Sequence, residues 1–165
     1  MRQKFVTTES IVVGTRPSGE AASILTLFTR ELGLLSVMAR GIRYERSKLR
    51  YHVQLYSFVE VTLVQGHEHW VLIGAVSIER LSGRPNSERA RAHVATLLVR
   101  FLGEADPHTE LYDNLLHIIH DGDGEGVETR LSLATFERLG YLGRAQKSEH
   151  DALFLIEQAV RESHL

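Results

Sequence analysis

Residues 40–50 hold a cluster of cationic side chains around a single acid, Glu45. Such groups neutralise the phosphates of a nucleic acid backbone, and the rings of neighbouring tyrosines can stack on its bases. We therefore predict that this basic loop (residues 40–50) binds a polyanion. The alternative is a solvated connection, as charge runs often are. The predicted site comprises Arg40, Arg43, Tyr44, Arg46, Lys48, Arg50 and Tyr51.

Two arginines outside the basic loop carry the same charge and are candidates to extend its positive surface. Arg16 precedes Pro17, and Arg30 follows a β-rich run. An arginine on its own is more often a surface residue than a ligand-binding one. We predict that both contribute to binding, with an ordinary surface position as the alternative.

The run DGDGEG at residues 121–126 has the spacing of a calcium-binding loop. Its acids and its last glycine match the first, third, fifth and sixth positions of such a loop. The twelfth position is Ser132, where a bidentate glutamate is needed. We interpret the run as a glycine-rich helix stop.

Histidines occur at spacings that could bind a metal. His117 and His120 lie three residues apart, with Asp121 directly after them, which leaves a small metal-dependent hydrolase open as an alternative function. His67 and His69 flank an expected turn. Because no further ligand can be identified, surface histidines are the favoured interpretation and no metal is predicted.

Motifs of known catalytic classes are missing from the sequence. It contains neither G-x-S-x-G nor the glycine-rich phosphate loops G-x-x-x-x-G-K-[ST] and G-x-G-x-x-G. We therefore predict no catalytic residue, no cofactor and no enzyme activity.

The composition is that of a globular protein with an uneven distribution of charge. The 165 residues are 43% hydrophobic and 24% charged. Residues 1–84 carry 11 Lys and Arg against 7 Asp and Glu, a net charge of +4, and residues 85–165 carry 8 against 14, a net charge of −6. A basic first half favours an anionic partner.

Cellular location is constrained by what the sequence lacks. There is no cysteine, which excludes disulfides and thiolate zinc sites. No apolar run approaches the roughly 18 residues of a membrane span, and MRQKFVTTES lacks the apolar segment of a signal peptide. We expect a cytoplasmic protein without membrane contact.

Five short β-rich runs precede residue 80 and predict strands. A small five-stranded sheet avoids exposed edges by closing, so we predict an antiparallel β-barrel, with a short helix at 49–55 before the fourth strand. The predicted strands are residues 10–15, 23–29, 34–39, 57–64 and 69–78.

Beyond the SGRPN segment (82–86) the apolar spacing becomes helical. We predict helices at 90–102, from Asp106 with Pro107 as first helical residue, at 127–139 before Gly140, and from Ser148. The fold class is therefore α+β, with a barrel domain at 1–82 and an α-helical domain at 83–165. We expect the helices to pack on the barrel, because their apolar stripes need a partner.

Several segments of the first half resemble one known family. They are ESIVVGTRPSGEAA, ILTLFTRELGLLSVMARGIR and SKLRYHVQLYSFVEVTLVQG, followed by a strand ending in Glu79 and Leu81. In the second half, LYDNLLHII and FERLGYLGR are similar more loosely. On these motifs the chain resembles the bacterial RecO family of DNA repair proteins.

This resemblance implies an oligonucleotide-binding (OB) barrel followed by a helical domain. It also implies binding of single- and double-stranded DNA, strand annealing, and action with RecR to replace single-strand DNA-binding protein by RecA. A nucleoid-associated protein in the cytoplasm is expected. Many members carry a four-cysteine zinc site after the Leu-Gly-Tyr turn, which this sequence lacks, and its helical half is shorter than usual.

The acidic tail of single-strand DNA-binding protein is a further expected partner. Such a tail needs an apolar groove with a cationic rim. The alternative is that the candidate cations only balance nearby glutamates. A different function class also stays open, an OB-fold adaptor that binds acidic peptides without significant DNA affinity. The candidate partner-binding residues are Arg130, Arg138, Arg144 and Lys147.

Overall fold

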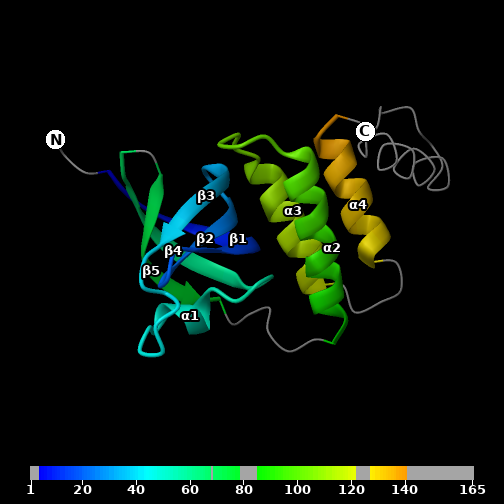
Figure 1. Cartoon of the computed structure of the whole chain (residues 1–165). Coiled ribbons are helices and arrows are strands. Elements are labelled where there is room, and N and C mark those ends of the chain that lie inside the picture. Colours follow the sequence, from blue (N-terminus) through cyan, green and yellow to red (C-terminus); the bar gives the residue numbers. More distant parts are fainter. Residues whose placement is uncertain (1–3, 68, 79–84, 122–126, 141–165) are drawn as a thin grey trace.

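The computed structural model describes residues 4–67, 69–78, 85–121 and 127–140. Five strands form a closed barrel, and helices follow it (Figure 1). The predicted domain boundary at 82–83 and the helix predicted from Ser148 lie outside the described residues. The elements are β1 (Phe5–Ser18), β2 (Ala22–Thr29), β3 (Gly33–Ala39), α1 (Leu49–His52), β4 (Phe58–Gln65), β5 (Trp70–Ser77), α2 (Pro85–Phe101), α3 (Thr109–Asp121) and α4 (Val127–Arg138).

The barrel closes through β1, which pairs with two neighbours. Its first half pairs with β4, up to Ile11 opposite Phe58, and its second half pairs with β2, up to Ser18 opposite Ala22. A bulge between Val12 and Gly14 lies where the strand passes from one partner to the other, and bulges bend a strand in this way. The order β1-β2-β3-β5-β4 confirms the predicted five-stranded OB-fold barrel. The barrel is not antiparallel throughout as predicted, because β3 and β5, which close it, pair in parallel.

The strands on the helical side are buried on both faces. Val12 points into the barrel core, whereas its neighbours Ile11 and Val13 belong to the core shared with the helices. Likewise Leu27 lies inside the barrel and Phe28 outside it, under the helices. Two-sided burial explains why these strands read as continuous apolar runs rather than alternating ones.

Predicted boundaries of two elements in the barrel half are wrong. The first strand spans Phe5–Ser18 rather than residues 10–15, because polar residues such as the buried Thr8 hid the strand pattern. The short helix ends at His52 rather than residue 55, since Val53 leaves helical geometry and Tyr56 has a positive φ of 65°.

The connection between α2 and α3 corrects another boundary. Asp106 and Pro107 were expected to start a helix, but α3 begins at Thr109. Residues before it are held against β3, since the backbone N–H of Ala105 donates to the carbonyl of Leu34 at 2.8 Å. The N-cap preference of Asp106 is worth only about 1 kcal/mol, so tertiary contacts of the preceding residues can override it.

Of the other two described helices, α4 agrees closely with the prediction and α2 does not. Helix α2 starts earlier than expected, at Pro85, a residue well suited to a first helical position. Helix α4 ends at Arg138, and Gly140 adopts a φ of 78° with its N–H bonded to the carbonyl of Glu137. This left-handed glycine stops the helix as predicted.

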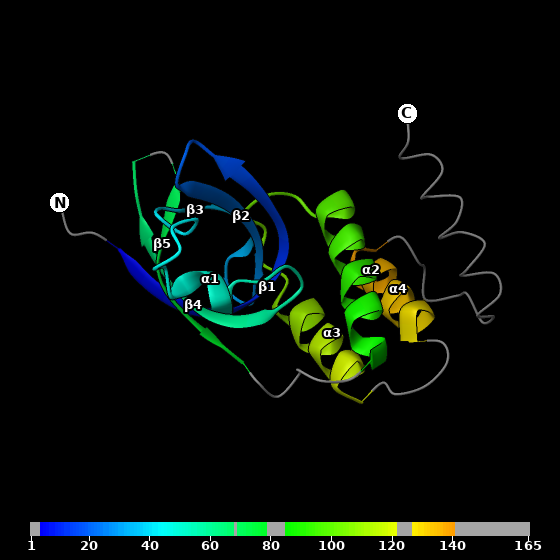
Figure 2. The same ribbon diagram turned by 60° about the horizontal axis from the view of Figure 1, so that its bottom comes forward.

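The helices pack against one side of the barrel, as the apolar stripes required (Figure 2). The ring of Phe28 on β2 lies 5.6 Å from that of Tyr112 on α3, and buried aromatic pairs contribute strongly to packing. The shared core comprises Ile11, Val13, Phe28, Leu34 and Phe58 from the barrel half with Val94, Ala95, Leu98, Leu102, Leu111, Tyr112, Leu115 and Leu131 from the helices.

Polar contacts at the edge of this core orient α3. The guanidinium of Arg30 donates to both carboxylate oxygens of Asp113, at 2.8 and 2.9 Å. This bond lowers the pKa of Asp113 below its ordinary value of 3.8 and raises that of Arg30. The hydroxyl of Thr109 donates to the carbonyl of Arg30 at 3.0 Å. The β2–β3 turn is therefore joined to the beginning of α3.

Replacing Gly33 by alanine should destabilise the protein much more than the same change at Gly19. Both residues have positive φ, 73° and 65°, which costs an L-residue about 1–2 kcal/mol. A Cβ at Gly33 would also meet the carbonyl oxygen of Asp106 at 2.1 Å, whereas nothing lies within 4 Å at Gly19. Urea unfolding of both variants measures the difference, and equal losses would contradict close docking of the 103–108 connection.

Replacing Asp113 by asparagine should remove an acid-sensitive part of the stability. Because the folded pKa of Asp113 is depressed, its contribution is present above the unfolded pKa near 3.8 and is lost as pH falls through the folded pKa. The wild type should exceed the variant in unfolding free energy at pH 7, and the gap should close below about pH 4. In an Arg30→Met background the substitution should have little effect, and an equally large effect there would exclude the pair as its cause.

Candidate nucleic-acid interface

The basic loop is fastened to the barrel at its middle. The backbone N–H of Arg43 donates to the carbonyl of Ala21 at 3.0 Å, and its guanidinium donates to the carbonyl of Gly19 at 2.9 Å. The adjacent Ile42 is 5% exposed and belongs to the barrel core. A buried side chain followed by a bonded one holds the loop against the β1–β2 turn.

This anchoring leaves most of the charge on the outside. Arg40, Arg43, Arg46 and Lys48 are exposed, and Arg50 on α1 is partly buried. Within the part of the chain that the structure describes, none of these cations forms an ion pair with a carboxylate. Unpaired cations held on a fixed surface are suited to bind an anion.

Both predicted tyrosines expose their rings next to arginines. Tyr44 is 54% exposed and Tyr51 is 63% exposed. The guanidinium carbon of Arg46 lies 5.7 Å from the centre of the Tyr44 ring, and that of Arg50 lies 4.8 Å from the centre of the Tyr51 ring. Cation–π contacts of this kind hold the rings in place and put flat aromatic surfaces beside positive charge.

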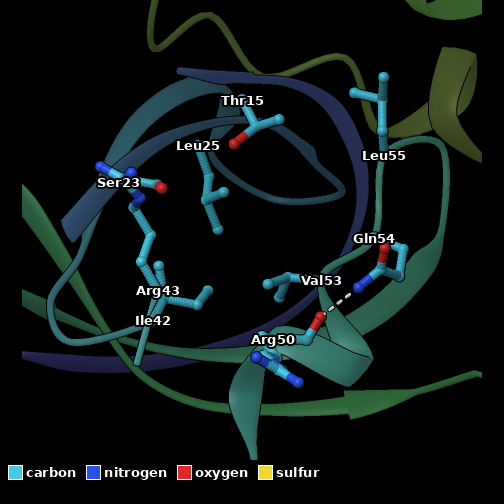
Figure 3. Close-up of a pocket in the computed structure, with 9 residues that line it drawn as sticks. All are labelled: Thr15, Ser23, Leu25, Ile42, Arg43, Arg50, Val53, Gln54 and Leu55. Carbon is cyan, nitrogen blue, oxygen red and sulfur yellow. Dashed lines mark hydrogen bonds between the residues drawn. The ribbon is translucent and has the colours of Figure 1, made fainter. Parts of the chain in front are cut away.

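A hollow of about 430 Å³ opens beside the basic loop, between the β1–β2 side of the barrel and α1 (Figure 3). Leu25, Ile42 and Val53 form its apolar part, and Arg43 and Arg50 lie at its border. Its size falls within the range of about 300–1,000 Å³ that small-molecule sites occupy. Polar side chains complete its lining: Thr15, Ser23 and Gln54.

A smaller hollow of about 200 Å³ lies on the other side of the basic loop. Arg40 and Met38 line it together with the β4–β5 turn, which contributes His67 and His69. Both histidines are exposed. The loop therefore lies between the β1–β2 turn and the β4–β5 turn, the two connections with which OB folds bind oligonucleotides.

The two outlying arginines are placed at different ends of the barrel. Arg16 is exposed on β1 opposite Ile24, close to the strand ends from which the basic loop leaves. Arg30 follows β2 at the opposite end, where it is paired with Asp113. The structure thus brings Arg16 near the basic loop, while the guanidinium of Arg30 is occupied in joining α3 to the barrel.

The helical candidates are only partly described. Arg130 is exposed on α4, and Arg138 forms an ion pair with Glu110 of α3. Arg144 and Lys147 lie outside the described residues, so the predicted tail-binding site stays a prediction. None of the helices in the described part combines the length and apolarity of a membrane crossing.

The metal hypotheses gain no support from the described residues, among which no group of three or more His, Asp or Glu could hold an ion. His117 is exposed on α3, the side chains of His120 and Asp121 are not among those described, and residues 122–126 lie outside the described ranges. Ser132, which would occupy the twelfth calcium position, is buried on α4 and hydrogen-bonded to His93 at 2.6 Å.

Sequence reasoning missed the polar lining of the larger hollow. Thr15 and Ser23 are two of several small polar residues in β1 and β2, and Gln54 follows α1. None of them stands in a recognisable motif. They meet only because β1, β2 and the segment after α1 converge at one end of the barrel.

Comparison with known proteins identifies relatives of the chain. Residues 1–79 match the family described as Recombination protein O N terminal. The chain is 30% identical over 133 residues to a DNA repair protein RecO of Dehalococcoides mccartyi, covering 79% of this chain and 52% of that protein. It is 32% identical over 130 residues to one of Rhodopirellula baltica, covering 76% and 48%. The chain spans about half the length of these relatives.

Proposed function

Because residues 1–79 belong to the RecO N-terminal domain family and most of the chain is related to DNA repair protein RecO, we propose that this protein binds DNA in recombinational repair. The observation that carries the proposal is the basic loop. Its exposed cations are held between the two turns that form the binding surface of OB folds.

The proposed binding is electrostatic and largely independent of sequence. Arg40, Arg46 and Lys48 are free of carboxylate partners within the described ranges, so they can neutralise successive phosphates of a strand. Single strands and duplexes both present this backbone. Exposed rings at Tyr44 and Tyr51 add stacking for unpaired bases.

The partners that the family resemblance implies belong to the same proposal. We propose a non-enzymatic mediator that anneals complementary strands and acts with RecR to load RecA onto DNA coated by single-strand DNA-binding protein. For the tail of that protein, Arg130 is the stronger candidate, since Arg138 is also exposed but is already paired with Glu110.

Neutralising three cations of the basic loop should flatten the salt dependence of DNA binding. If the loop contacts about four phosphates, log affinity for a single strand should fall with log salt at a slope near −3, because each contributes roughly −0.7. Replacing Arg40, Arg46 and Lys48 by Gln should bring the slope to about −1. Arg43 is kept because it fastens the loop. Fluorescence anisotropy at several salt concentrations measures both slopes.

The matched control is Arg130→Gln, which removes a positive charge from an exposed position on α4 and should leave the slope unchanged. A wild type that binds an acidic peptide but no oligonucleotide at low salt would favour the adaptor function instead. A triple variant with the wild-type slope would show that the phosphates are bound elsewhere.

Removing the exposed rings should weaken single-strand binding without changing the salt slope. Tyr44→Ala or Tyr51→Ala should cost about 1–3 kcal/mol of binding free energy if the ring stacks on a base. The corresponding Phe variants keep the ring and should bind nearly as the wild type does. Equal losses for the Phe and Ala variants would assign the effect to the hydroxyl, which in Tyr51 accepts a hydrogen bond from Arg50 at 2.9 Å.

A further inference from the structure

The larger hollow has an apolar part and polar groups in addition to the positive charge of the basic loop. Its apolar part comes from Leu25, Ile42 and Val53, which are 2%, 5% and 7% exposed and belong to the barrel core. Little of their surface meets water, but the lining also includes Leu55, which is 42% exposed and leaves apolar surface in contact with water. An apolar ligand surface of matching shape would remove this contact and gain free energy.

Polar groups around this apolar part are available for hydrogen bonds. Ser23 is only 8% exposed, and neither its hydroxyl nor that of Thr15 is bonded to any other residue in the described ranges. Gln54 donates its amide N–H to the carbonyl of Arg50, which leaves the side-chain oxygen to accept. Figure 3 shows Ser23 and Gln54 on opposite sides of the hollow.

Two arginines, Arg43 and Arg50, lie at the border of the same hollow. The guanidinium of Arg43 uses one donor for Gly19, and that of Arg50 uses one for Tyr51. A guanidinium carries five N–H donors, so each retains donors for a second acceptor. An anionic group attached to a ligand in the hollow would therefore contact two cations at the border of the hollow.

We propose that this hollow receives one unstacked base of a single DNA strand. The apolar faces of a nucleobase match the apolar part of the hollow, and its polar edge matches the hydroxyl and amide groups. The phosphates of the strand that carries the base match the two arginines. The inference rests on the proposed function and deepens it. A duplex keeps its bases stacked, so only a single strand gains this contact.

Filling the hollow should therefore remove its own share of base-dependent binding and spare backbone binding. Thr15→Tyr adds a ring at an exposed rim position of β1, where aromatic residues suit a strand. Thr7→Tyr adds the same ring at an exposed position of β1 outside the hollow and serves as the control. Gln54→Trp fills the hollow from the other side, should Thr15→Tyr perturb β1.

The probes are a labelled oligothymidylate, an oligonucleotide of the same length made only of abasic sites, and a duplex. One base in the hollow should make the wild type bind oligothymidylate about 5- to 160-fold more tightly than the abasic strand, and stacking on Tyr44 and Tyr51 adds to this preference. Thr15→Tyr should lose the part of this preference that the hollow contributes and keep the part that comes from Tyr44 and Tyr51, with unchanged affinity for the abasic strand and the duplex. Thr7→Tyr should behave as the wild type.

Other outcomes would overturn the inference. If the wild type binds the abasic strand as well as oligothymidylate, no base is taken up, although DNA binding itself stands. If both filling variants keep the full wild-type preference for oligothymidylate, or weaken all three probes equally, the hollow is not the base site. A wild type that binds none of the probes contradicts the proposed function as well.

Free nucleotides share the chemistry of a base with a phosphate, and competition separates them from a strand. Thymidine monophosphate should not displace labelled oligothymidylate at concentrations at which the unlabelled oligonucleotide does, because it lacks the further phosphates that the basic loop would bind. Displacement at equal concentration would assign the hollow to a free nucleotide and overturn the strand as its ligand.

Discussion

Closure of the barrel through β1 is the constraint from which the rest of the structure follows. A 14-residue strand that pairs with both β2 and β4 leaves those two strands without a free edge on that side. The closed sheet then has an interior filled by alternate residues and an outer face that the helices cover on one side. Closure also brings the β1–β2 turn, the basic loop and α1 to one end, so the candidate interface is a consequence of it.

The β2–β3 hairpin contacts the helical half at one end and leads into the basic loop at the other. At its turn, Arg30 and Gly33 contact the helical half, through the carboxylate of Asp113 and the backbone of Asp106. At its other end, Ala39 pairs with Ser23 and leads into the basic loop. One hairpin thus joins the helices to the surface proposed for DNA, and a change in docking of the helices would act on strands that also carry the loop.

Arg30 and Arg43 have different roles because the fold places different groups beside them. The guanidinium of Arg30 meets a carboxylate 83 positions later in the chain, so it is neutralised at the domain junction. That of Arg43 meets a backbone carbonyl and keeps its charge uncompensated. Neither partner lies near the arginine in sequence, and a charge pattern along the chain cannot distinguish the two cases.

The amino-acid sequence by itself determined the classes and order of the elements. Short β-branched runs, a change to helical spacing and the left-handed Gly140 depend on interactions between near neighbours, and these are readable from the chain. Tertiary structure alone decided the start of β1, where polar residues are buried, the start of α3, whose preceding residues are bonded to β3, and the hollow formed by Thr15, Ser23 and Gln54. Each of these depends on contacts between residues far apart in sequence, which local patterns do not encode.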